Sequence, residues 1–233
     1  MSQQVTTFGI PANARDIVVF VHGFGVRWDS RGMFVDIQHA LPKNWGYVFF
    51  DFYNIDQSDV FISPIDDQIA RLESVLQKLK QLAPTATVHI IAHSKGCIIT
   101  SLTQPTITGN VVFLAPPEIF GSKLEKYFAR YPNAKLTTTE ISIPRKDGTI
   151  THIPLNFFEQ TKDVDAEEAM LNYSKKARLH ILQTTQDEVL GETAYNRLRK
   201  SPDIEITAID SDHNFTEHSR EILISYLKGV LNE

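Results

Sequence analysis

Residues 88–97 are Val88-His89-Ile90-Ile91-Ala92-His93-Ser94-Lys95-Gly96-Cys97. The apolar run predicts a strand buried on both faces of a parallel sheet. It would lead into a helix through a small-x-Ser-x-Gly turn, which is sterically open only where the residues two before and two after the serine lack bulk. Ala92 and Gly96 meet this condition. Such a turn would expose the Ser94 hydroxyl, with the helix N-terminus and the Lys95 N–H directed at the same point.

Apolar, β-branched runs of this kind recur along the chain and alternate with helical periodicity. Apolar residues at spacings of three and four predict a helix over residues 65–82, with Ser63 as N-cap and Pro64 at the first helical position. Shorter patterns predict helices near residues 34–41 and 222–230. The alternation predicts a three-layer α/β/α sandwich with a mostly parallel sheet. The predicted strands are residues 16–21, 47–52, 88–92, 110–114, 178–182 and 204–209.

One interval interrupts the alternation, because about 60 residues separate the strand ending at Leu114 from the next one. A structureless loop of that length would be unusual in a compact domain. Two β-branched runs flank Asp147-Gly148, which predicts a β-hairpin, and helices are expected near residues 122–130 and 165–175. We therefore predict an inserted α+β cap at residues 117–176, with the core formed by residues 1–116 and 177–233.

Composition excludes several classes of protein. The chain has 233 residues with 23 Lys+Arg and 28 Asp+Glu, hence a net charge of −5, and it has no basic stripe of the kind that binds nucleic acid. Its one cysteine, Cys97, cannot form an intramolecular disulfide and is expected to be a buried small hydrophobe. The sequence shows neither a leader peptide nor a membrane span, so we expect a cytoplasmic protein without a membrane partner. Nothing in it implies a metal or an organic cofactor.

Three segments resemble the α/β-hydrolase fold family. Residues 92–96 resemble its nucleophile elbow, G-x-S-x-G, with Ala92 in place of the first glycine. His22-Gly23-Phe24-Gly25 resembles the family's His-Gly oxyanion loop, which implies that the main-chain N–H groups of Phe24 and Lys95 bind an oxyanion. Asp51-Phe52-Tyr53 followed by Ser58 resembles a further strand-end segment of the family. The resemblance covers residues 16–231, although the residues before the first strand have room for one short strand where the family commonly has two.

The resemblance also implies a catalytic triad in the chain order Ser, Asp or Glu, His. Asp187 and His213 each follow a predicted strand at the sheet edge where α/β proteins place their sites. Ser94 would then be the nucleophile, His213 the general base and later acid, and Asp187 the orienting carboxylate. Glu188 and Glu118 are alternative acids, and in the non-catalytic interpretation Ser94 only caps a helix.

Further residues near these segments have two interpretations each. His89 and His93 are expected to be packing or supporting residues. Lys95 would contribute its main chain, although its ammonium could favour an acidic substrate. His218 with residues 210, 212 and 213 is better explained as a solvated turn than as a metal site. Cap aromatics could line an acyl pocket or form the cap's own core, and Trp28 could line the mouth or lie on the surface. The candidate substrate-binding residues are His22, Gly23, Trp28, Phe120, Phe157 and Phe158.

A serine nucleophile argues against the haloalkane dehalogenase and epoxide hydrolase branches of the family, which use an aspartate. The cap resembles those of small esterases, including monoacylglycerol-lipase-like and hydroxycinnamoyl-esterase-like members. The resemblance therefore implies hydrolysis of a small-molecule carboxylic ester through an acyl-enzyme. An aminopeptidase or thioesterase using the same triad, or a catalytically silent ligand-binding protein, remains the alternative.

Overall fold

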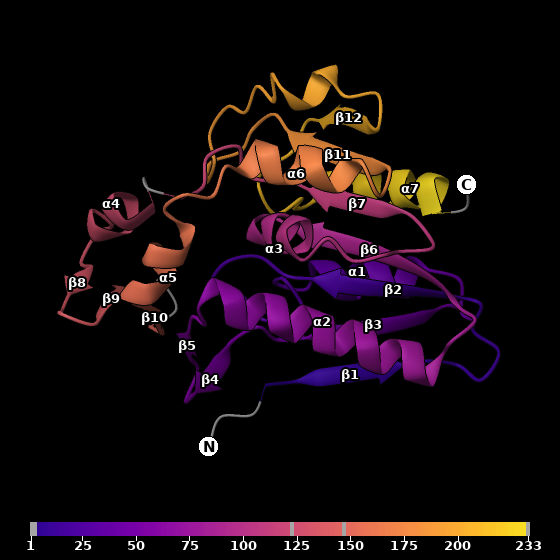
Figure 1. The fold of residues 1–233 in the computed structure, drawn as a ribbon, viewed down its shortest axis with the longest axis horizontal. Helices are drawn as coiled ribbons and strands as arrows, with labels where there is room; N and C mark the ends of the chain where they lie inside the picture. The colour runs from indigo at the N-terminus through magenta and orange to yellow at the C-terminus, as the bar shows by residue number, and fades with distance from the viewer. Residues whose placement is uncertain (1–3, 122–123, 146–147, 232–233) are drawn as a thin grey trace.

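A computed structural model describes residues 4–121, 124–145 and 148–231. Within these residues the main sheet has seven strands in the order β1-β3-β2-β6-β7-β11-β12. In Figure 1 these strands are stacked in this order from the bottom of the picture to the top. Only β1 is antiparallel to its neighbour among these pairings, so the described part of the sheet is mostly parallel. The strands are β1 (Thr6–Gly9), β2 (Asp16–Val21), β3 (Gly46–Phe50), β6 (Thr87–His93), β7 (Val111–Leu114), β11 (Leu179–Thr184) and β12 (Ile204–Ile209).

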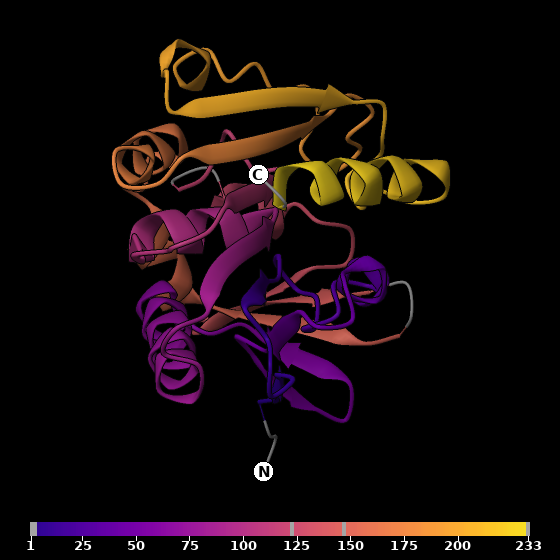
Figure 2. The same cartoon turned by 90° about the vertical axis from the view of Figure 1, so that its right-hand side faces the viewer.

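Helices cover both faces of this sheet, as Figure 2 shows. On one face lie α2 (Ile65–Leu82), α3 (Lys95–Thr103) and α6 (Ala166–Ser174); on the other lie α1 (Met33–Ala40) and α7 (His218–Leu231). A 3₁₀ turn, η1 (Leu198–Lys200), precedes β12. Successive side chains of a strand point to opposite faces, so Val19 packs in the core beneath α2 and α3 and Phe20 in the core beneath α1 and α7. The predicted three-layer fold class is confirmed.

The predicted start of α2 is wrong by one position. The helix begins at Ile65, and Pro64 has extended backbone angles (φ −53°, ψ 159°) at the N-cap position. The Pro64 carbonyl accepts the first helical hydrogen bond, from the Gln68 N–H. Ser63 does not cap the helix, because its hydroxyl donates to the Phe52 carbonyl at 2.9 Å and thereby ties the start of α2 to the segment that follows β3.

A second sheet lies where the chain leaves the carboxyl ends of β3 and β7 (Figure 1). Its strands are ordered β4-β5-β10-β9-β8. β9 and β10 form the predicted antiparallel hairpin, whose turn residues 146–147 lie outside the described residues. The members of this region are β4 (Asn54–Asp56), β5 (Asp59–Phe61), α4 (Leu124–Ala129), β8 (Lys135–Leu136), β9 (Glu140–Pro144), β10 (Ile150–Pro154) and α5 (Leu155–Thr161).

The second sheet and the predicted cap range, residues 117–176, do not coincide. β4 and β5 come from residues 54–61, and β5 joins the sheet by parallel pairing with β10. Conversely, α6 belongs to the helical layer of the main sheet: the Tyr173 ring packs against Phe113 at 6.5 Å, and its hydroxyl donates to the Pro105 carbonyl. The contacts of its buried face, and not its place in the chain, determine where this helix packs.

None of the helices that the structure describes is long and apolar enough to cross a bilayer.

Candidate active site

Ser94 occupies a sharp turn between β6 and α3. Its backbone angles are φ 53° and ψ −126°, a strained conformation that costs about 1–3 kcal/mol in a residue with a side chain. The Ser94 N–H donates to the Leu114 carbonyl of the neighbouring strand at 2.8 Å, which anchors the turn to the sheet. Gly96 allows α3 to approach β2: a Cβ there would lie 2.3 Å from the Val21 carbonyl oxygen and 2.7 Å from that of His22. The glycine that the motif requires two positions after the serine therefore has a direct steric explanation.

The structure joins Ser94, His213 and Asp187 in one hydrogen-bonded series. Ser94 Oγ lies 3.0 Å from His213 Nε2, and His213 Nδ1 lies 2.8 Å from Asp187 Oδ2. Asp187 follows β11 and His213 follows β12, and both strands run parallel to β6. Because the carboxyl ends of parallel strands share one edge of the sheet, three residues far apart in the chain meet there.

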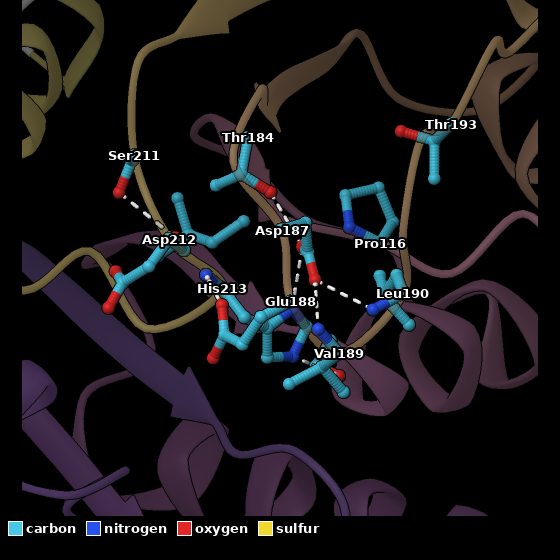
Figure 3. A network of polar contacts seen from close by, with 12 residues as sticks. Pro116, Thr184, Asp187, Glu188, Val189, Leu190, Thr193, Ser211, Asp212 and His213 are labelled. Carbon is cyan, nitrogen blue, oxygen red and sulfur yellow. Dashed lines mark hydrogen bonds and ion pairs between the residues drawn. The ribbon is translucent and has the colours of Figure 1, made fainter.

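Four donors hold the Asp187 carboxylate (Figure 3). Oδ1 accepts from the N–H groups of Val189 (3.0 Å) and Leu190 (2.7 Å), while Oδ2 accepts from the Thr184 hydroxyl (2.6 Å) and from His213. Burial acts to raise the pKa of Asp187, but the hydrogen bond and charge of His213, with the Leu190 and Thr184 donors, outweigh it and hold the pKa below its usual value. Asp187 is therefore ionised at neutral pH.

The two alternative acids are engaged elsewhere. Glu118 Oε2 accepts from the Ala194 N–H at 2.8 Å. Glu188 Oε2 accepts from the main-chain N–H of His213 at 3.1 Å and not from its ring. Of the three candidates, Asp187 is the one whose carboxylate faces the imidazole.

The loop that follows β2 passes directly over the serine. A Cβ on Gly23 would lie 3.2 Å from Ser94 Cβ, so a larger residue would press on the nucleophile. His22 supports this loop from within the core: it is fully buried, its Nδ1 donates to the Gly23 carbonyl (2.9 Å), and its Nε2 accepts from the Phe52 N–H (3.0 Å). Burial, and next the charge of Lys95, lowers the pKa of His22 to about 3, so the ring is neutral. His22, expected among the substrate-binding residues, thus faces the main chain, and the Tyr53 hydroxyl also donates to Gly23.

The Lys95 side chain is turned into the core. Its Nζ donates to Gln68 Oε1 of α2 and lies 4.7 Å from the centre of the Phe52 ring and 5.1 Å from that of Tyr53. Burial lowers the pKa of the Lys95 ammonium well below its usual value. An ammonium held in this way does not contact an acidic substrate at the elbow, so Lys95 offers the site its main-chain N–H.

Aromatic side chains connect the loop over the serine to the second sheet. Phe24 stacks on Phe128 of α4 (ring centres 4.8 Å apart) and contacts Phe157 of α5 (5.7 Å). Phe157 and Phe158 are buried against each other, and Phe120 packs half-buried on the same core. The predicted pocket residues of α5 therefore form the core that holds Phe24.

Trp28 lies apart from this aromatic core. Its ring packs on Phe49, and its main-chain N–H donates to Asp51 Oδ1 at 2.8 Å. Asp51 also accepts from the Val5 N–H, so the Asp-Phe-Tyr segment anchors neighbouring loops.

The remaining candidates have structural partners. His89 stacks on Trp45 and accepts from the Asn110 N–H, which makes it a packing residue. Cys97 is buried, and burial raises the pKa of its thiol. His218 is exposed beside Glu221, and the described residues bring together no three His, Cys, Asp or Glu side chains able to hold a metal ion. The sequence arguments missed Thr184, whose signal is a hydroxyl at a strand end three residues before the acid.

The chain is similar to known proteins of the α/β-hydrolase fold. Residues 2–116 match the family model described as "Alpha/beta hydrolase of unknown function (DUF900)". Over 114 residues the chain is 29% identical to a probable lysophospholipase, BODYGUARD 2 of Arabidopsis thaliana, and this match covers 45% of the chain but 23% of the plant protein.

Two of the solved structures that share the fold illustrate the likeness, which extends over nearly the whole chain. Est1E from Butyrivibrio proteoclasticus has a TM-score of 0.72 at 14% identity, covering 100% of this chain and 96% of Est1E. A monoacylglycerol lipase from Paleococcus ferrophilus has a TM-score of 0.62 at 15% identity, covering 97% and 99%. At these identities the likeness shows the fold alone.

Proposed function

Since the chain belongs to the α/β-hydrolase superfamily, we propose that it is a serine hydrolase that cleaves a small-molecule carboxylic ester. The observation that carries the proposal is the continuous series from Ser94 through the His213 imidazole to the Asp187 carboxylate, with contacts of 3.0 and 2.8 Å. A serine that only capped α3 would not need a histidine and an ionised carboxylate arranged behind it, and Ser94 makes no side-chain cap hydrogen bond.

The chemistry follows from these contacts. Ser94 Oγ attacks the ester carbonyl carbon while its proton passes to His213 Nε2. Asp187 holds the His213 tautomer whose proton is on Nδ1, and it stabilises the imidazolium that forms. The imidazolium then protonates the leaving alcohol, which produces an acyl-enzyme and free alcohol. Water, deprotonated by His213, attacks the acyl carbon, and the carboxylic acid leaves as Ser94 recovers its proton.

Two main-chain N–H groups would bind the developing oxyanion. Lys95 is the first residue of α3, so its N–H lies at the positive end of the helix. Phe24 follows Gly23, whose Cα passes close to Ser94. Removing one donor of this kind costs about 10²–10³ in kcat in serine hydrolases.

The proposed substrate is an ester with an apolar acyl group. Phe24 follows Gly23, the residue that packs against Ser94, and its ring stacks on Phe128, so the loop over the serine carries an aromatic side chain. The similar proteins include a probable lysophospholipase and a monoacylglycerol lipase, whose names indicate ester substrates. Est1E, a third similar protein, has been solved with ferulic acid bound. Matched aryl esters, acyl thioesters and aminoacyl amides, compared by kcat/KM, test this preference.

Intact-protein mass after treatment with a fluorophosphonate tests the proposal. We expect one covalent adduct on the wild type and on Ser142→Ala, a control serine in the second sheet, and no adduct on Ser94→Ala. Ser94→Ala should also lower ester kcat at least about 10³-fold while the protein stays folded. A folded wild type without an adduct would contradict the proposal and favour a ligand-binding protein without turnover.

A further inference from the structure

The chain neighbours of two triad residues bind the main chain of the third. His93, which precedes Ser94, donates from Nε2 to the His213 carbonyl at 3.0 Å. Glu188, which follows Asp187, accepts the His213 N–H at 3.1 Å. Both polar main-chain groups of His213 are therefore held by side chains that neighbour its triad partners in the chain, His93 at the end of β6 and Glu188 in the loop after β11.

His93 is fixed as the donor in its contact. A carbonyl oxygen can only accept, so Nε2 carries the proton, and Nδ1 is left to accept from the Ser30 hydroxyl at 3.1 Å. His93 is 2% exposed, and the centre of its ring lies 4.9 Å from that of the His213 ring. Burial, and next the neighbouring His213, lowers the pKa of His93 to about 3, so the ring is neutral at pH 7.

Glu188 differs from His93 in that its side chain is exposed, and this side chain still turns back to His213 (Figure 3). Asp187 and Glu188 are adjacent, and they bind two different parts of the same histidine, the ring and the main-chain N–H. The acid loop consequently fixes both the rotation of the imidazole and the position of the backbone that carries it.

The His213 loop needs such external contacts. It runs from β12 to α7 and contains two non-glycine residues in the left-handed region, Phe215 (φ 50°) and Glu217 (φ 52°). Its internal bonds, from the Thr216 N–H and hydroxyl to Asp212, shape the loop but do not attach it to the nucleophile. A displacement of 1 Å in a reacting group can cost about 10² in rate.

We propose that His93 and Glu188 are positioning residues that clamp the main chain of His213, so that its imidazole keeps contact with Ser94 through both proton transfers. The inference rests on the proposed function. In this proposal Glu188 acts as a hydrogen-bond acceptor for the His213 N–H, and its negative charge is not required.

The test compares Glu188→Ala with Glu188→Gln. Glutamine keeps an oxygen that can accept the His213 N–H, whereas alanine removes it. We expect Glu188→Ala to lower ester kcat and the rate of fluorophosphonate labelling about 10- to 100-fold, with KM within about threefold of wild type. Glu188→Gln should recover both rates to within about threefold, with an unshifted pH–rate profile. Glu192→Ala, which removes an exposed carboxylate from the same loop, should match wild type.

Each outcome has a distinct meaning. Equal rates for Glu188→Ala and wild type would overturn the clamp. Glu188→Gln as slow as Glu188→Ala, with a shifted pH profile, would overturn it in favour of a charge effect. A wild type that is not labelled at all would instead overturn the proposed function, and the inference with it. His93→Gln, whose amide can still donate to the His213 carbonyl, should be faster than His93→Phe.

Discussion

Replacing Asp187 by asparagine should disable the proposed base without disturbing the fold. Val189 and Leu190 offer N–H donors to Oδ1, so the asparagine oxygen must stay on that side. The amide nitrogen then takes the place of Oδ2 and donates toward His213 Nδ1. His213 can satisfy this contact only with its proton on Nε2, the atom that faces Ser94. In that tautomer the imidazole cannot accept the serine proton.

The expected loss is large because every turnover begins with that transfer. The corresponding change in another serine hydrolase leaves the geometry intact and lowers kcat about 10⁴-fold. At about 1.36 kcal/mol per factor of ten, this corresponds to about 5.4 kcal/mol of lost transition-state stabilisation. The free energy of unfolding should change much less, since both main-chain donors to the side chain keep an acceptor.

Steady-state hydrolysis of an aryl ester, with circular dichroism as a check on folding, measures this effect. The matched control is Glu118→Gln, because Glu118 binds the Ala194 N–H and not the imidazole; its kcat should stay within about twofold of wild type. More than about a tenth of the wild-type kcat in Asp187→Asn, or a hundredfold loss in Glu118→Gln, would refute the assignment of Asp187 as the orienting acid.

Two further predictions concern stability. Gly96→Ala should lower the free energy of unfolding by more than about 2 kcal/mol, because the new Cβ would lie 2.3 Å from the Val21 carbonyl oxygen. Gly229→Ala in α7 should raise the free energy of unfolding by about 0.5–1 kcal/mol, because nothing lies within 4 Å of the new Cβ and alanine favours a helix. Urea unfolding of both variants measures the difference. His22 and His93 have pKa values lowered to about 3, so between about pH 6.5 and 3 the unfolded chain binds more protons than the folded protein does. As the pH is lowered through this range, the free energy of unfolding should therefore fall by about 1.4 kcal/mol per pH unit for each histidine. Equal urea midpoints at pH 8 and pH 5 would contradict this.

Much of the fold could be predicted because its signals are local. The apolar runs, the helical spacing of residues 65–82 and the small residues around Ser94 each reflect constraints within a few positions of the chain. The positions of Asp187 and His213 at the ends of predicted parallel strands also predicted that they share one edge of the sheet, since parallel strands end on the same side.

The contacts between distant segments could not be read from these local signals. The pairing of β5 with β10, the packing of α6 on β7 and the burial of the Lys95 side chain all depend on which surfaces meet after folding. The same holds for the choice of Asp187 over Glu188, two adjacent carboxylates that chain order cannot distinguish. His93 and His213 lie 120 positions apart, and their hydrogen bond exists because the sheet brings the two loops together. Periodicity and turn chemistry act along the chain, whereas the supports of this site act across it.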